Sequence, residues 1–330
     1  MRLMLYRLQF KAPLHIGLEG IGAEKIDLTV HSDTLWGALA NAYLALGLPF
    51  DFEQPQFFVS SAFPYFGEHL FFPLPMGALD YLFEEAEEQY LKAIKKIEFV
   101  EKSLFEKLIG GQKPSWQSLY FYKRNKAYLL GKACDELNET MIFQVQETPR
   151  VTLDRYTDSA VEGQIFYFAQ MVFAPQAGLF FLARFNGEDE QNRFEAALRF
   201  LGDEGLGADR TVGKGLFDFD ARKLELETPQ TADMFTTLAL YHPHKDEIKN
   251  GLLRNARYGL ITRKGFAFNP AVRGKRRKFV RMFTEGSVFT RVTENGQSPG
   301  DVPTVIPAQG DFIPFSVKRY GIAFDVPVVI

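Results

Sequence analysis

The last third of the chain consists mostly of strand-like runs. After Pro229 these runs are MFTTLALYH, RYGLITRKGFAF, KFVRMF, SVFTRV and YGIAFDVPVVI, at residues 234–242, 257–268, 278–283, 287–292 and 320–330. Short apolar or alternating runs of this kind are typical of strands. A polar stretch that contains Pro229, LELETPQTAD, separates them from the preceding sequence. We therefore predict a strand-rich C-terminal domain over residues 224–330.

Helices and strands are mixed before that stretch. Residues 2–10 alternate like a central strand, with Leu3 and Leu5 on the face opposite to Tyr6. Residues 32–46 have helical spacing, with Ser32 or Asp33 as the N-cap. Further helices are predicted at 80–109 and 189–201, and further strands at 141–146, 164–174, 179–185 and 216–226. The fold class is therefore α+β, with an N-terminal domain over residues 1–223 that carries a helical insertion.

Composition excludes several classes of protein. Cys134 is the single cysteine, so an internal disulfide and the zinc sites that need several cysteines are ruled out. Charge or proline interrupts every apolar run before the roughly 20 residues that a membrane span needs. The first residues alternate where a signal peptide would be uniformly apolar. We predict a cytoplasmic protein without a membrane partner.

The segment GLGADRTVGKGLF, at residues 205–217, places four glycines around Arg210 and Lys214. It is not a P-loop, because Gly215 stands where the magnesium-binding hydroxyl is required. It is not a dinucleotide fingerprint either, because GLGADR lacks the third glycine and follows a helix. Two interpretations remain. Either the glycines let the backbone approach an extended ligand while Arg210 and Lys214 bind its phosphates, or they form tight turns between a helix and a strand.

Positive charge is concentrated in one segment. Residues 254–281 contain ten basic residues and no acidic one, although the whole chain has a formal net charge of −3. Within this segment KRRK, at 275–278, is followed directly by FVRMF, so that cations and aromatic rings interleave as they do where single-stranded nucleic acid is bound. The alternative is a basic loop that faces an acidic protein subunit.

The histidines offer one functional candidate. His15, in KAPLHIG after the first strand, is placed to act as a general base on a ribose hydroxyl, to stack on a base, or simply to close a turn. His242 and His244 have Pro243 between them and no nearby third ligand. We therefore predict neither a metal nor an organic cofactor.

Five segments in order resemble one known superfamily. They are HIG, HSDTLWGAL, RVTLDRYTDSAVEGQIFYF, GLGADRTVGKGLF and EGSVF, beginning at residues 15, 31, 150, 205 and 285. Together they resemble the RAMP proteins of CRISPR systems, and within that superfamily the Cas5-type RAMPs of the type III-A (Csm) interference complex. The resemblance extends over nearly the whole chain.

The resemblance implies two ferredoxin-like domains and a protruding β-hairpin, the thumb. It also implies a non-catalytic RNA-binding subunit at the base of a multisubunit complex. There the protein would hold the repeat-derived 5′ tag of the crRNA and join the large polymerase-like subunit to the backbone RAMP subunits.

The resemblance also assigns site residues. The thumb would run through residues 150–165, with Arg150 and Arg155 on the RNA backbone. His15 and Ser32 lie in the matching early loop and helix start, where helix amides bind phosphate, although Asp33 would oppose an anion there. In the glycine-rich loop the resemblance assigns Gly205, Gly207, Arg210, Gly213, Lys214 and Gly215. The charge pattern of the basic segment adds Arg273, Lys275, Arg276, Arg277, Lys278 and Arg281 as further expected RNA-binding residues.

Two other functions fit the sequence. One is a crRNA-processing endoribonuclease of the Cas6-type RAMPs with His15 as general base, although those enzymes carry the glycine-rich loop near the carboxyl terminus. The other is a protein-docking scaffold without direct RNA contact, in which the basic segment binds an acidic subunit.

Overall fold

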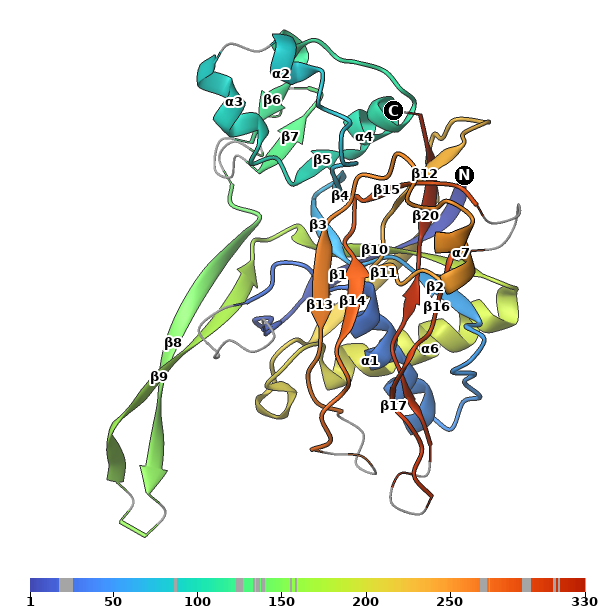
Figure 1. Ribbon diagram of the computed structural model, residues 1–330. Coiled ribbons are helices and arrows are strands. Elements are labelled where there is room, and N and C mark those ends of the chain that lie inside the picture. Colours follow the sequence, from blue (N-terminus) through green and yellow to red (C-terminus); the bar gives the residue numbers. More distant parts are fainter. Residues whose placement is uncertain are drawn as a thin grey trace.

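The structure combines a large mixed sheet with helices on its surface, so the α+β class is confirmed (Figure 1). The computed structural model describes residues 1–17, 26–85, 88–122, 127–132, 134, 137, 140–154, 156–157, 159–267, 272, 274–292, 298–310, 313 and 315–329. In these ranges no helix has both the length and the apolar character that a membrane crossing requires.

The N-terminal domain has the β-α-β-β-α-β order of a ferredoxin-like fold. Its elements are β1 (Arg2–Phe10), α1 (Ser32–Ala45), β3 (Phe63–Phe66), β10 (Ala177–Phe185), α6 (Glu188–Glu204) and β11 (Phe217–Glu225). Their strands lie in the order β11-β1-β10-β3, and β2 (Phe57–Val59) also pairs with β10. Strand β1 is central and antiparallel to both of its neighbours. In this register Tyr6 pairs with Phe181 of β10 on one side and with Ala221 of β11 on the other.

Strand β1 divides the interior into two cores, as its alternation predicts. Tyr6 and Leu8 pack with residues of α1 and α6, including Trp36 and Phe194. Leu3 and Leu5 face the other way, into a core that contains residues of the insertion and of the C-terminal strands.

The insertion follows β3. It comprises β4 (His69–Pro73), α2 (Leu82–Glu85), α3 (Glu88–Ile94), β5 (Phe99–Glu101), α4 (Lys102–Ile109), a 3-10 turn η1 (Trp116–Ser118), β6 (Tyr120–Phe121) and β7 (Tyr128–Leu130). The expected one or two helices over 80–109 are thus three short helices interrupted by a strand. The reason is that Phe99 and Val100 are buried between β4 and β7, where the chain adds to the sheet instead of continuing a helix.

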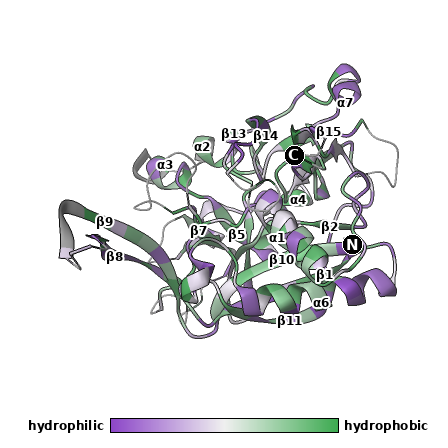
Figure 2. Ribbon diagram, turned by 90° about the horizontal axis from the view of Figure 1, so that it is seen from below, coloured by the Kyte–Doolittle hydropathy of each residue, from purple (hydrophilic) through white to green (hydrophobic). Residues whose placement is uncertain are grey.

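The predicted thumb is present and longer than residues 150–165. Strands β8 (Phe143–Asp154) and β9 (Ser159–Phe173) form a two-stranded antiparallel hairpin. It projects from the body in two views at right angles, and Figure 2 shows hydrophobic segments along β9 (Figures 1 and 2). The strands expected at 141–146 and 164–174 form the two sides of its base.

The C-terminal part is rich in strands, as predicted. It comprises β12 (Met234–Thr237), α7 (Lys245–Lys249), β13 (Leu260–Arg263), β14 (Val280–Phe283), β15 (Val288–Thr290), β16 (Gly300–Asp301), β17 (Thr304–Ile306), β18 (Val317–Lys318), β19 (Gly321–Ile322) and β20 (Asp325–Val328). Strands β15, β12 and β20 form a three-stranded sheet, and β13 pairs with β14. Strand β11 continues to Glu225, two residues past the predicted boundary, and β12 begins at Met234.

Candidate nucleic-acid interface

Three segments that are distant in sequence meet at the base of the hairpin. Leu14 lies in the loop that follows β1, which we call the early loop. It exchanges two backbone hydrogen bonds with Met171 of β9, at 2.9 and 2.7 Å. The amide of Ala208 donates to the carbonyl oxygen of His15 at 2.9 Å, and the amide of Gly215 donates to that of Pro13 at 3.0 Å. The structure therefore brings together the early loop, the thumb and the glycine-rich loop, which were identified separately in the sequence.

The ring of Phe168 on β9 lies at the centre of this junction. The guanidinium carbon of Arg150 and the ammonium nitrogen of Lys214 each lie 4.1 Å from its centroid. The ring of His15 also lies 4.1 Å away, centroid to centroid. A cation over an aromatic face is attracted by the ring quadrupole, so Phe168 holds two cations close together.

A carboxylate and an amide contact the same cations. Asp209 Oδ2 lies 2.6 Å from Arg150 Nη2 and 4.0 Å from Lys214 Nζ. Lys214 Nζ donates to Gln170 Oε1 at 2.6 Å. Burial lowers the pKa of Lys214, and the positive charge of Arg150 lowers it further, while Asp209 opposes the change. Two cations therefore share one carboxylate, which leaves the cluster with a net positive charge.

The glycines of the loop are used mainly by the protein's own backbone. A Cβ on Gly207 would lie 2.3 Å from the carbonyl oxygen of His15, and one on Gly215 would lie 1.9 Å from that of Leu206. A Cβ on Gly205 would lie 2.4 Å from the carbonyl oxygen of Lys214, whereas Gly213 has open space beside it. The tight-turn interpretation thus accounts for three glycines, and Gly213 is the one placed for a ligand to approach.

His15 is enclosed by this junction. Its side chain is only 4% exposed, and Nδ1 donates to the carbonyl oxygen of Ala169 at 2.6 Å. Arg210 begins the short 3-10 turn η2 (Arg210–Val212) and is half-buried. Arg155 lies outside the described residues.

The start of α1 is buried at the boundary between the two domains. The hydroxyl of Ser32 accepts a hydrogen bond from the amide of Leu240 at 3.0 Å, and the amide of Ser32 donates to Ser61 Oγ at 2.8 Å. Helix α1 begins at Ser32 with His31 at the N-cap position, so the serine hydroxyl of a neighbouring segment replaces the expected cap from Ser32 or Asp33. Ser32 is a residue of the domain junction and forms no part of the RNA surface proposed below.

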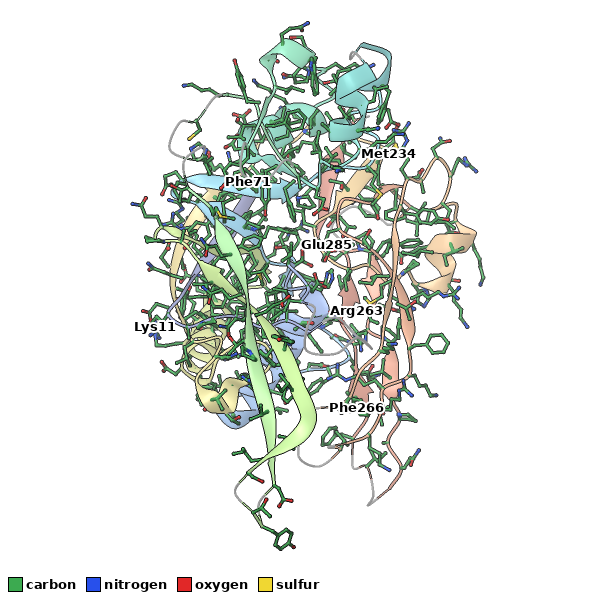
Figure 3. The ribbon with its side chains drawn as sticks, turned by 90° about the vertical axis from the view of Figure 1, so that its left-hand side faces the viewer. Lys11, Phe71, Met234, Arg263, Phe266 and Glu285 are labelled. Atoms are coloured by element: carbon green, nitrogen blue, oxygen red, sulfur yellow. The ribbon has the colours of Figure 1, made fainter. Side chains whose placement is uncertain are left out.

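Buried ion pairs complete this junction. Asp33 contacts both Arg263 and Arg319, and burial of its carboxyl is outweighed by these cations, which hold its pKa well below the usual range. His31 lies between two carboxylates, with Nε2 at 3.0 Å from Asp27 Oδ2 and Nδ1 at 2.8 Å from Glu285 Oε1. In Figure 3, Arg263 and Glu285 lie where the C-terminal strands meet the N-terminal domain.

Burial alone would lower the pKa of His31. The charge of Glu285 and the hydrogen bonds with Asp27 and Glu285 outweigh burial and raise this pKa to about 10. His31 is therefore a cation at neutral pH, as the two carboxylates around it require.

The basic segment divides into structural and exposed cations. Arg263 is buried in its ion pair with Asp33, and Arg257 Nη1 lies 3.0 Å from Asp80 Oδ2. Arg277 is half-buried, and Arg273 lies outside the described residues. The cations exposed to solvent within the predicted site are Lys275, Arg276, Lys278 and Arg281.

Aromatic rings flank the exposed cations. Phe266 is 65% exposed and Phe279 is 70% exposed. A backbone bridge joins Phe266 to Arg276, and the amide of Lys278 donates to the carbonyl oxygen of Val305 at 2.9 Å. The interleaving of rings and cations is thus present on the surface beside β13 and β14.

Metal ligands do not gather in the described parts of the chain. No group of three or more His, Cys, Asp or Glu side chains there is arranged to hold a metal ion.

The sequence could not identify three members of the hairpin-base cluster, Phe168, Gln170 and Asp209. Phe168 and Gln170 are two residues apart on β9, which indicates a shared face of the strand. Their proximity to Lys214 depends on the pairing of β9 with the early loop, which no local pattern encodes.

Comparison with known proteins agrees with this architecture. The model of the RAMP superfamily matches residues 7–218. This match includes most of the ferredoxin-like domain, the hairpin and the glycine-rich loop. The chain therefore belongs to the RAMP superfamily.

The remaining sequence narrows the assignment. The model of the CRISPR Csm4 C-terminal domain matches residues 230–328. The protein named CRISPR system Cms protein Csm4 in Thermococcus onnurineus is 27% identical over 270 residues, which cover 78% of this chain and 80% of the relative. The protein of the same name in Methanocaldococcus jannaschii is 23% identical, with 94% and 90% coverage. Within the superfamily, the protein is a RAMP of the Csm4 type.

Solved structures have the same fold. The crystal structure of a Csm3-Csm4 subcomplex of the type III-A CRISPR-Cas interference complex contains a chain that matches with a TM-score of 0.65 and 20% identity over the full length of both chains. A chain in the crystal structure of a Csm1-Csm4 cassette in complex with cA4 matches with a TM-score of 0.62 and 20% identity, covering 100% of this chain and 99% of that one.

Proposed function

We propose that this protein is a non-catalytic RNA-binding subunit of a type III-A CRISPR (Csm) effector complex in the cytoplasm. It holds the repeat-derived 5′ tag of the crRNA in antiviral defence. The Csm4 names of the relatives and the two family models support the complex. The hairpin-base cluster supports the RNA contact.

The observation that carries the RNA contact is the positive cluster of Arg150 and Lys214 over Phe168. Single-stranded RNA is bound by cations on its phosphates and by aromatic rings. Arg150 and Lys214 lie where the thumb leaves the body, and Arg210 precedes Lys214 in the glycine-rich loop. The exposed cations and rings beside β13 and β14 extend the proposed RNA surface into the C-terminal domain.

The burial of His15 supports a role without catalysis. A general base must lie within hydrogen-bond reach of the proton that it removes. His15 is covered by the hairpin and the glycine-rich loop, and Nδ1 is engaged by the backbone of β9. We infer that the ring holds the early loop against the thumb.

We infer two protein partners. Structurally similar chains were crystallised with Csm1 and with Csm3. By this similarity, the protein joins the large polymerase-like subunit to the backbone RAMP subunits.

The first experiment is to purify the tagged protein from its native host and to sequence the RNA that accompanies it. We expect short RNAs that share one repeat-derived 5′ end, in a multisubunit particle. A particle that contains no RNA and survives nuclease treatment would instead support the docking scaffold. Cleavage of repeat RNA by the purified protein, lost on His15→Ala, would support the endoribonuclease.

A further inference from the structure

The carboxylate of Asp209 occupies the position between the two cations at the hairpin base. Its Oδ2 atom makes a close ion pair with Arg150 Nη2, at 2.6 Å, and a longer one with Lys214 Nζ, at 4.0 Å. Arg150, Lys214 and Asp209 remain partly exposed, at 31%, 12% and 25% of their side-chain surface. Asp209 Oδ2 itself is buried, so an anion from solution reaches this pair of cations only when the Asp209 side chain moves aside.

The backbone places Asp209 at this position. Asp209 has a φ of 60°, in the left-handed region, and lies between Gly207 and Gly213, which also have positive φ. Its carbonyl oxygen accepts from the amide of Val212 at 3.1 Å. Aspartate and asparagine tolerate this conformation better than most residues. The glycine-rich loop therefore holds the Asp209 carboxylate between the cations with little backbone strain.

Each of the two cations also has a contact that does not involve Asp209. Both lie over Phe168, and Lys214 also donates to Gln170. Removal of the carboxylate therefore leaves a preformed pair of cations. A phosphodiester group has two non-bridging oxygens that share one negative charge, and an arginine guanidinium binds such a pair of oxygens in a fork.

We propose that Asp209 is an internal substitute for an RNA phosphate. Its carboxylate occupies the Arg150–Lys214 site in the free protein, and one phosphodiester group of bound RNA displaces it. Asp209 thereby weakens the binding of arbitrary anions, since each must first compete with an attached carboxylate. The inference rests on the proposed function, because it concerns one phosphate subsite of that RNA surface.

The test is the binding of a short fluorescent single-stranded oligouridylate by the full chain, followed by anisotropy. Asp209→Asn keeps the size of the side chain and suits the positive φ, but removes the charge. We expect Asp209→Asn to bind the oligonucleotide about three- to tenfold more tightly at low salt, because an ion pair no longer has to be broken.

The matched control is Asp246→Asn. Asp246 is an exposed carboxylate paired with Lys249 at 3.0 Å on α7, which lies on the opposite side of the body from the hairpin in both views (Figures 1 and 2). Asp246→Asn changes the net charge by the same amount as Asp209→Asn. Because Asp246 lies far from the hairpin base, we expect this variant to bind the oligonucleotide with the affinity of the wild type.

A double-mutant cycle identifies the cation through which Asp209 acts. Arg150→Gln should weaken binding, and in that background Asp209→Asn should give a much smaller gain. Thermal unfolding of each variant confirms that it is folded.

The outcomes separate the inference from the proposed function. If the wild type binds and Arg150→Gln weakens binding while Asp209→Asn changes nothing, the phosphate-substitute role is wrong and the RNA site stands. A gain in the Asp246→Asn control equal to that of Asp209→Asn would show only a net-charge effect and would also overturn the inference. Absence of RNA binding by every variant, Asp209→Asn included, would overturn the RNA site itself.

Discussion

Asp33 at the start of α1 and Arg263 at the end of β13 form a buried two-point ion pair between the two domains. Arg263 Nε donates to Asp33 Oδ2 and Arg263 Nη2 donates to Asp33 Oδ1, both at 3.1 Å. Arg319 contacts the same carboxylate. Since Asp33 lies in the motif HSDTLWGAL, this motif joins the domains.

We expect Asp33→Asn to destabilise the protein by about 3–5 kcal/mol, because two buried guanidinium groups lose their counter-charge. The free energy of unfolding in urea measures this change. The matched control is Arg2→Ala, which breaks an exposed ion pair with Glu225 at 3.1 Å and should cost less than about 1 kcal/mol. Equal losses in the two variants would contradict a structural role of the buried pair.

The raised pKa of His31 predicts how stability changes with pH. The pKa is about 10 in the folded protein, against an ordinary value of 6.5. The stabilisation that protonated His31 gives to the folded protein is therefore complete below about pH 6.5, and it is lost as the pH rises toward about 10. Within this window the free energy of unfolding should fall by up to about 1.4 kcal/mol per pH unit.

Urea unfolding of the wild type and of His31→Gln over this pH range tests the sign. The variant should lack most of the decline, whereas His244→Gln, at a partly exposed histidine next to α7, should retain it. A wild type whose stability rises with pH in this window would contradict the ion-pair arrangement of His31 with Asp27 and Glu285.

Two glycines of the glycine-rich loop should respond differently to substitution by alanine. Gly207 and Gly213 both have positive φ, so alanine at either position costs about 1–2 kcal/mol from backbone strain. Only at Gly207 would the new Cβ collide with the carbonyl oxygen of His15. Gly207→Ala should therefore lose about 1–3 kcal/mol more than Gly213→Ala in urea unfolding. A similar loss at both positions would show that the close approach to the early loop is not needed.

Local pattern predicted most of the fold. The alternation of β1 assigned Leu3 and Tyr6 to opposite cores, and helical spacing located α1 and α6. The insertion was less predictable, because Phe99 and Val100 are too short a run to show a period. Only pairing with β4 and β7 makes them a strand.

The candidate site was predictable in part. Arg150, Lys214 and His15 were identified in separate segments, and the structure brings them around Phe168. The role of Ser32 was not, since its partner Leu240 lies more than two hundred residues away. An N-terminal helix amide looks the same in sequence whether it binds a phosphate or another part of the chain.

The exposed cations beside β13 and β14 carry the last prediction. Lys275, Arg276 and Lys278 are exposed near Phe266 and Phe279, whereas Arg277 is half-buried and is left unchanged. Reversal of these three charges to glutamate should weaken binding of single-stranded RNA and flatten its salt dependence. The slope of log K against log salt should become shallower by about 0.7 for each phosphate that the protein no longer neutralises. Lys245→Glu with Lys249→Glu, on α7, is a control that reverses two charges away from the basic segment and should leave most of the slope intact. Binding and slope that stay unchanged in the triple variant would remove the basic segment from the RNA surface. Its aromatic and cationic side chains would then be available to a protein subunit, and the hairpin base would be the part of the proposed RNA surface that remains.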